Sequence, residues 1–222
     1  MSGREHPIVL RPSKAARIAF LLVAVVLVIV LDFLVVISFI GQRLWADPRL
    51  FHDHWFSLPA YMWIGIALLA VWVVIRATTQ KVVLTPEKIR VHGLLRVPRS
   101  AAWDKVASIW AVDDIARSNR AAQIVDGPAD ARDAVIVMGH GVRRIANVSG
   151  RLYGMKAQDA LLTEGRKRQI RVEEIGQVTA RDLQHMIPGS LKFVDRHPSM
   201  VFYVGVAGYV AHYVLTFMIW GL

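Results

Sequence analysis

The chain has 222 residues, 55% of them apolar, with no cysteine, a formal net charge of +10 and a mean hydropathy of +0.40. A chain without cysteine cannot form disulfides, thiolate metal sites or cysteine nucleophiles. The apolar residues concentrate in three blocks and exceed what an ordinary soluble domain contains. Between the second and third blocks, about 120 continuous residues remain, enough for one small domain with its own core.

The basic charge lies on one side of the apolar blocks. Residues 1–17 carry four basic residues and one acidic residue, residues 77–199 carry 20 and 13, and residues 42–57 are neutral. Because cytoplasmic segments of membrane proteins are enriched in Lys and Arg, this asymmetry predicts an orientation. We expect a multi-pass plasma-membrane protein with residues 1–17 and 77–199 in the cytoplasm. Residues 42–57 and the C-terminus are then external.

The first two segments are a basic arm, 1–17, and a membrane span, 18–41. The arm contains proline but no apolar helical face, so we expect it to be loosely ordered. Its Arg11, Lys14 and Arg17 are candidate contacts with anionic inner-leaflet lipid or with a partner. The following apolar run exceeds the length of a signal-peptide core and is long enough to cross a bilayer uncleaved.

Asp32 is an ionisable residue inside the predicted first span, and His212 lies in the last one. Such residues inside a membrane usually face protein or water. Asp32 is therefore a candidate intramembrane contact, either with His212 or with a partner subunit. The alternative is a proton or ion site, although a relay normally needs several such groups.

Residues 42–57 form a short external loop with aromatic residues suited to the membrane interface. Its His52, Asp53 and His54 lack a clear third protein ligand, so no metal site is predicted. Residues 58–76 and 200–222 are the second and third spans. In the third, Gly205, Gly208 and Ala211 form a candidate helix-packing face, because small residues allow close approach of helices.

The central domain, 77–199, is organised around alternating apolar and polar residues from 81 to 112, typical of antiparallel strands. Strands are predicted at 81–84, 88–92, 94–102, 106–112, 134–138 and 142–148. A short amphipathic helix is predicted at 155–164, with Gly165 just after its end. Thr179 and Asp182 resemble a capping box that opens another helix. The expected core comprises Val91, Trp103, Val106, Ile109, Ile136 and Leu161.

A second basic cluster follows the amphipathic helix and consists of Arg166, Lys167, Arg168 and Arg171. It is a candidate contact for lipid or a partner. The other interpretation is a solvated face, favoured beside a helix C-terminus. Nucleic-acid binding is not expected, because no recognition helix or exposed aromatic platform is evident.

The central strands resemble those of bacterial pleckstrin-homology (PH-like) domains. The resemblance lies in Thr85-Pro-Glu87-Lys-Ile-Arg-Val91, Gly93 and the Trp103-Asp-Lys-Val106 step. Later residues, among them 149–152, 180–183 and 196–198, are similar to small membrane-anchored PH-domain proteins of actinobacteria. The resemblance implies an α+β membrane protein: a cytoplasmic antiparallel PH-like domain capped by helix 155–164 and held by three spans. Eukaryotic relatives often bind phosphoinositides through basic residues of the first loop. We do not expect that activity here, because the turn at 85–87 carries a carboxylate and has only Lys88 nearby.

Motifs for catalysis are absent: there is no Walker-type loop, no HExxH and no nucleophile elbow. We therefore expect no enzyme activity and no cofactor. The first functional hypothesis is a membrane-anchored scaffold, an accessory or assembly subunit of a larger integral-membrane complex. The second is an adaptor or sensor whose basic domain binds anionic lipid or a peptide at the inner leaflet. An enzyme or transporter built around Asp32 and His212 is the third.

Overall fold

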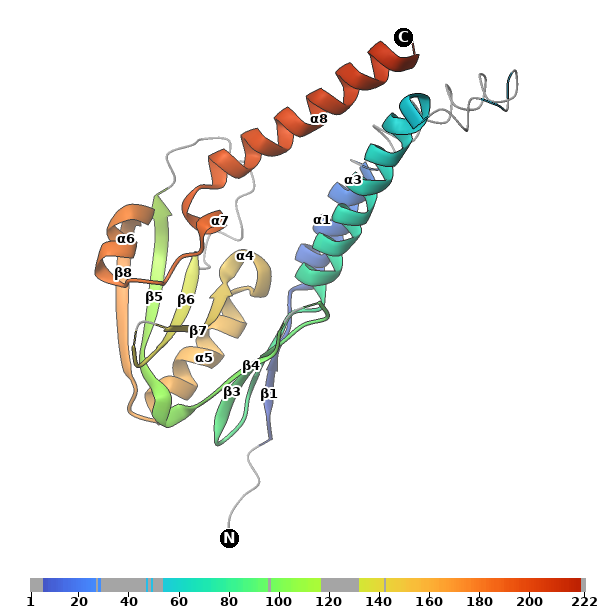
Figure 1. The fold of residues 1–222 in the computed structure, drawn as a ribbon. Coiled ribbons are helices and arrows are strands. Elements are labelled where there is room, and N and C mark those ends of the chain that lie inside the picture. The colour runs from blue at the N-terminus through green and yellow to red at the C-terminus, as the bar shows by residue number, and fades with distance from the viewer. Residues whose placement is uncertain are drawn as a thin grey trace. The chain divides into compact units, whose positions relative to one another are not determined.

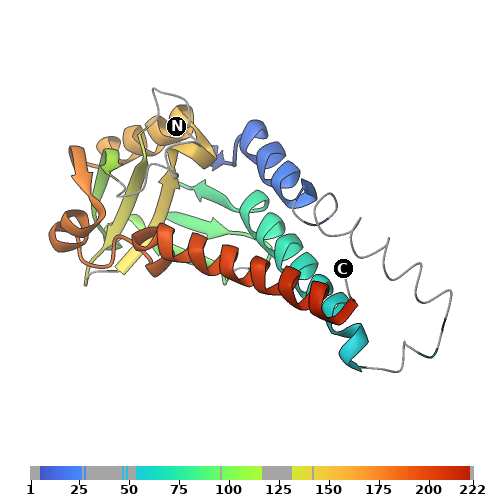
Figure 2. The same ribbon diagram turned by 90° about the horizontal axis from the view of Figure 1, so that it is seen from above.

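The computed structural model describes residues 6–26, 28, 47, 49, 54–95, 97–116, 132–141 and 143–220. The chain divides into two compact units. Unit 1 comprises Met1–Arg17 and Arg76–Ser199, and unit 2 comprises Ile18–Ile75 and Met200–Leu222. Figures 1 and 2 show the mixed α+β composition of unit 1 and the long helices of unit 2.

The first sheet of unit 1 has four antiparallel strands in the order β1-β2-β3-β4. These strands are β1 (Ile8–Leu10), β2 (Lys81–Leu84), β3 (Lys88–His92) and β4 (Arg99–Ala102). The expectation of a loosely ordered arm is wrong for its described strand, because Ile8 pairs with Leu84 and Leu10 with Val82. The apolar Ile-Val-Leu segment extends the sheet, and Leu10 is 5% exposed.

The strand predicted at 94–102 is shorter than expected. Leu94 and Leu95 lie in a turn, and β4 begins only at Arg99. Leu95 has a φ of 59°, in the left-handed region, which is incompatible with a continuous strand.

The second sheet follows a short 3₁₀ turn, η3 (Trp103–Lys105), and has the order β7-β6-β5-β8. Its strands are β5 (Val106–Ala116), β6 (Ala134–Gly139), β7 (Arg143–Ser149) and β8 (Arg171–Thr179). A wholly antiparallel sheet was expected, but β8 runs parallel to β5. The reason is the connection: after β7 the chain passes through α4 (Gly150–Tyr153) and α5 (Met155–Lys167) before it enters β8. A helical crossover is the usual link into a parallel strand.

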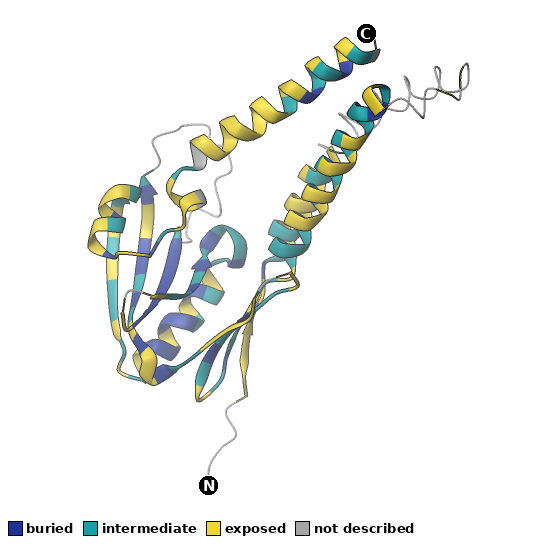
Figure 3. Ribbon diagram, in the orientation of Figure 1, coloured by how far each residue is buried: buried dark blue, intermediate teal, exposed yellow. Residues whose placement is uncertain are grey.

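The hydrophobic core lies on both faces of the second sheet. Alternate residues of β6 point to opposite faces, so Val135 and Val137 join one cluster and Ile136 and Met138 join another. The first cluster also contains residues of the first sheet and α5, and the second contains Leu183 of α6 (Ala180–Met186). Figure 3 shows the resulting buried band. All six predicted core residues are buried, with Trp103 the most exposed at 8%.

Two helix signals in the sequence have different outcomes. Thr179 caps α6 as predicted, because its hydroxyl accepts a hydrogen bond from the Asp182 N–H. Gly165 does not follow the end of α5 but lies inside it. A Cβ at Gly165 would lie 2.4 Å from Cδ1 of Ile109, so this glycine permits close contact between α5 and β5. A last short helix of unit 1, α7 (Phe193–Arg196), precedes the C-terminal segment of unit 2.

Among the described residues, the helices that contribute to unit 2 are α1 (Lys14–Val25), α3 (His54–Thr78) and α8 (Pro198–Trp220). Two described helical segments, His54–Thr78 and Met200–Ile219, are long and apolar enough to cross a membrane, by length and composition. Residues 54–57, expected in the external loop, belong instead to the first turns of α3. Most of the predicted first span, 18–41, lies outside the described residues.

Candidate functional site

The predicted basic contact residues do not gather in one place. Arg11 and Arg17 line a hollow together with Lys81 and His92, which we call the arm hollow. Lys167 and Arg168 line a different hollow, next to His6, Ile8 and the Thr85–Pro86 turn. Lys14 is exposed and lines neither hollow.

The cations of the cluster at 166–171 pair with acidic residues of unit 1. Arg166 Nη2 lies 2.7 Å from Glu174 Oε1, and Lys167 Nζ lies 3.1 Å from Glu164 Oε1. Arg168 pairs with Glu164, and Arg171 pairs with Glu173. Each of the four cations thus already has a carboxylate partner. This pairing supports the solvated, structural interpretation of the cluster over a lipid site.

Glu164 is the centre of that cluster and is only 6% exposed. Burial by itself raises the pKa of its carboxyl group, but hydrogen bonds from Arg168 and Lys167 and their positive charges outweigh burial. The pKa of Glu164 is therefore held below its usual value. Arg168 also lies over Trp103, whose Nε1 donates a hydrogen bond of 2.8 Å to the Thr85 carbonyl. These contacts tie α5 to the entry of β5.

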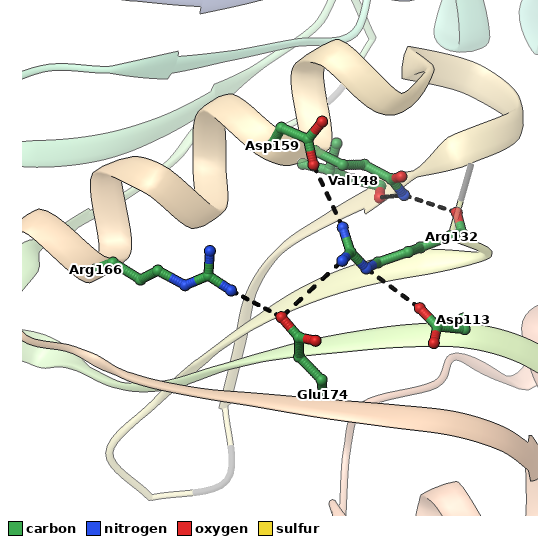
Figure 4. Close-up of polar contacts among 7 residues, drawn as sticks. Asp113, Arg132, Val148, Asp159, Arg166 and Glu174 are labelled. Atoms are coloured by element: carbon green, nitrogen blue, oxygen red, sulfur yellow. Dashed lines mark hydrogen bonds and ion pairs between the residues drawn. The ribbon is translucent and has the colours of Figure 1, made fainter. Parts of the chain in front are cut away.

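A second ion-pair network joins β5, α5 and β8 around Arg132 (Figure 4). The Arg132 guanidinium lies 3.2 Å from Asp113, 3.3 Å from Asp159 and 4.0 Å from Glu174. The fully buried Gln158 donates from Nε2 to the carbonyls of Arg132 and Val148, at 2.7 and 3.1 Å. Because every charge here faces an opposite one, we interpret this network as structural.

A groove between the outer strands of the two sheets is, in contrast, lined by Lys and Arg residues of which only Arg144 pairs with a described carboxylate. Strands β4 and β7 are edge strands that contact each other. A hollow of about 270 Å³ at this junction, the β4–β7 groove, has no carboxylate in its lining. It is lined by Arg99, Ser100, Ala101, Lys105, Gly139, His140, Arg143, Arg144 and Ile145.

The cations of the β4–β7 groove differ in how they are held. Arg144 is fixed, because its guanidinium donates to the Ser190 carbonyl at 2.6 Å and to Asp195 at 3.2 Å. Arg99, Lys105 and Arg143 form no ion pair with any other described residue. They are exposed and can meet an anionic ligand. The sequence prediction missed this groove, since its cations come from three separate segments and converge only when the two sheets pack.

The arm hollow has a volume of about 550 Å³ and no carboxylate in its lining. One side is built by the arm: the Ser13 N–H donates to the Leu152 carbonyl at 2.7 Å, and Pro12 is buried. Arg17 donates from Nε and Nη2 to the Pro12 carbonyl, at 3.0 and 2.8 Å. The candidate contact residues Arg11 and Arg17 thus line a concave surface, whereas Lys14 does not.

The predicted intramembrane residues are only partly described. Asp32 lies outside the described residues. His212 is 2% exposed, and its carbonyl accepts a 2.7 Å hydrogen bond from Thr216 Oγ1. Gly205, Gly208 and Ala211 are exposed on α8, and a Cβ at either glycine would meet nothing within 4 Å. Their role as a helix-packing face stays a prediction. Among the described residues, no group of three His, Asp or Glu could hold a metal ion.

Comparisons with protein-family models, with curated proteins and with solved structures find no match to this chain.

Proposed function

We propose that this protein is a non-enzymatic, membrane-anchored scaffold, an accessory subunit of a larger integral-membrane complex. The observation that carries the proposal is the β4–β7 groove, where Arg99, Lys105 and Arg143 line a concavity without any carboxylate. A groove of this kind is complementary to an acidic segment of a partner protein. Charge complementarity of this kind contributes chiefly to specificity and to the rate of association.

The contrast within unit 1 supports this reading of the groove. Elsewhere Arg132, Arg166, Lys167 and Arg168 are balanced by nearby carboxylates. Arg99, Lys105 and Arg143 form no ion pair with a described residue, so the groove cations repel one another and destabilise the free domain slightly. An acidic partner would relieve that repulsion.

The anchoring part of the proposal combines the two apolar helices with the charge asymmetry. We propose that residues 18–41 form a third span and that unit 1 is a cytoplasmic PH-like domain of a bacterial plasma-membrane protein, with an external C-terminus. The two sheets followed by α5 are compatible with such a domain, and the parallel strand β8 is an addition to it. The excess of basic residues in 1–17 and 77–199 supports the orientation.

The test is recovery of the complex from the native membrane in mild detergent. The tagged full-length chain is expected to bring down one integral-membrane protein in stoichiometric amount. The double variant K105Q/R143Q should lose that protein. The matched control K156Q/R181Q removes two exposed cations outside the groove and should retain it. Equal recovery with both variants would overturn the groove as the contact.

A second candidate function, an adaptor or sensor of anionic lipid, is favoured by the arm hollow. It does not exclude the first, because the arm hollow and the β4–β7 groove share no lining residue.

A further inference from the structure

The β3–β4 loop carries apolar side chains in an unusually exposed position. Leu94 is 62% exposed, Leu95 is 53% exposed and Val97 is 80% exposed. Clusters of exposed large apolar residues commonly mark protein or membrane contacts. Leu95 also adopts a φ of 59°, which a branched side chain rarely tolerates. Strained backbone of this kind tends to be kept where it serves a function.

This loop forms part of the arm hollow. Gly93 and Leu94 line the hollow beside Arg11, Arg17 and Lys81. The Leu94 N–H donates to Thr79 Oγ1 at 3.0 Å, which fastens the loop to the segment that follows α3. The apolar loop and the arm hollow are therefore continuous in unit 1, because Leu94 belongs to both.

The covalent chain places this feature next to the start of the predicted first span and the end of α3, however the two units are oriented. Arg17 directly precedes Ile18, and Arg76 to Thr79 directly follow Ile75, where the boundaries between the units fall. One residue spans at most about 3.6 Å. If the proposed first span and α3 cross a membrane, Arg17 and Thr79 lie within a few residues of its surface.

The cations of the hollow are available to a ligand. Among the described residues, Arg11, Arg17 and Lys81 form no ion pair. Hydrogen bonds to the Pro12 carbonyl use two N–H groups of Arg17, and the guanidinium carries five. The bonds hold this planar group in place and leave three donors. A guanidinium held in this way matches the oxygens of a phosphate.

We propose that the arm hollow binds the phosphate-bearing headgroup of an anionic phospholipid, while Leu94, Leu95 and Val97 enter the boundary between headgroups and acyl chains. This inference rests on the membrane anchoring proposed above, but not on the β4–β7 groove. Arg11, Arg17 and Lys81 surround the phosphate, and the loop supplies apolar contact with the same lipid leaflet. The hollow thereby fixes unit 1 against the membrane surface.

The first test measures lipid binding to the full-length protein in mild detergent by native mass spectrometry. Short-chain phosphatidylglycerol is expected to bind with one-to-one saturation and at least tenfold more tightly than phosphatidylcholine of equal chain length. The variant R11Q/K81Q should weaken phosphatidylglycerol binding by roughly 25-fold, about fivefold for each cation. The variant L94S/V97S should weaken binding of both lipids, and the control K156Q/R181Q should change neither. Equal affinity for both lipids in the wild type, or an equal loss with the control, would overturn the site.

Inorganic phosphate distinguishes a lipid from a free anion. We expect millimolar phosphate not to displace phosphatidylglycerol, because it lacks the apolar contacts. Displacement by phosphate together with unchanged binding by L94S/V97S would overturn the lipid as the ligand. Retention of the partner by R11Q/K81Q, with loss of lipid selectivity, would separate this site from the scaffold function.

A second measurement does not depend on the folding of charge variants. In the cysteine-free chain, a nitroxide introduced through Val97→Cys should be protected from a water-soluble nickel relaxant in phosphatidylglycerol bilayers. A nitroxide introduced through Arg181→Cys, on α6, should stay accessible. Equal accessibility of the two probes would overturn insertion of the loop.

Discussion

The guanidinium of Arg168 lies over the indole ring of Trp103, with 4.5 Å between its central carbon and the ring centre. The contact links the residue that follows α5 to the 3₁₀ turn that precedes β5. Trp103 is 8% exposed, and its Nε1 is bound to the Thr85 carbonyl. One aromatic residue thus joins the first sheet, the second sheet and the helix.

Trp103→Ala should lower the stability of the full-length protein by about 3–5 kcal/mol, because it removes a buried aromatic ring. At 2–4 °C per kcal/mol for a chain of this size, the melting midpoint should fall by roughly 10 °C. Trp103→Phe, which keeps a ring but loses the hydrogen bond to Thr85, should cost less. Thermal unfolding in detergent measures both. A melting midpoint of Trp103→Ala equal to that of the wild type would contradict this role.

Glu164 should make stability depend on pH in the acid range. Its pKa is lowered in the folded state, so the unfolded state binds more protons there. The stabilisation is present above the unfolded value of about 4.5 and is lost as the pH falls through the folded pKa. Glu164→Gln should therefore be less stable than the wild type at pH 7, and the difference should shrink below pH 4.5.

The control for Glu164→Gln is Glu87→Gln, which neutralises an exposed carboxylate between β2 and β3. Its unfolding midpoint should follow that of the wild type at each pH. A constant difference between Glu164→Gln and the wild type, from pH 7 down to pH 3, would count against the ion pairs as the cause.

Gly165 should tolerate a methyl group only if Ile109 becomes smaller. The Cβ of Gly165→Ala would lie 2.4 Å from Cδ1 of Ile109, which is fully buried and has little room to move. Overpacking typically costs about 1–3 kcal/mol, while Gly→Ala inside a helix by itself gains about 1 kcal/mol. The single variant should therefore be destabilised or at best neutral.

In an Ile109→Val background the clashing Cδ1 is absent. Gly165→Ala should then stabilise the protein, so the effect of one substitution becomes more favourable in the presence of the other. A double-mutant cycle of unfolding free energies measures this coupling. Additive free energies would show that α5 and β5 do not meet at these two residues.

The sequence predicted the parts of the fold that follow from periodicity alone. The apolar–polar alternation between 81 and 112 predicted β2, β3 and most of β5, and the six expected core residues are buried. Strand β8 was missed because its apolar residues Val172, Ile175 and Val178 recur every third residue, and the strand lies half exposed at a sheet edge. The arm was misjudged because three apolar residues form a strand only when β2 is present to pair with them.

The candidate site was predicted less well than the fold, for a related reason. Basic residues can be counted in a sequence, but their neutralisation depends on tertiary pairing. Arg166 looked equivalent to Arg11, yet Glu174 on β8 neutralises Arg166, while Arg11 lines an open hollow. The cations of the β4–β7 groove come from β4, η3 and β7, so no local sequence pattern marks them.

The proposed orientation makes an independent prediction that uses the absence of cysteine. Asp47→Cys should react in intact cells with an impermeant thiol reagent, because Asp47 is exposed and lies in the predicted external loop. Ser100→Cys should be protected in intact cells, since Ser100 is exposed on β4 in the predicted cytoplasmic unit. After permeabilisation both positions should react, which shows that each thiol is chemically accessible. Labelling of Ser100→Cys in sealed cells would place unit 1 outside the cytoplasm, so the inner-leaflet lipid site and the cytoplasmic scaffold would both be rejected.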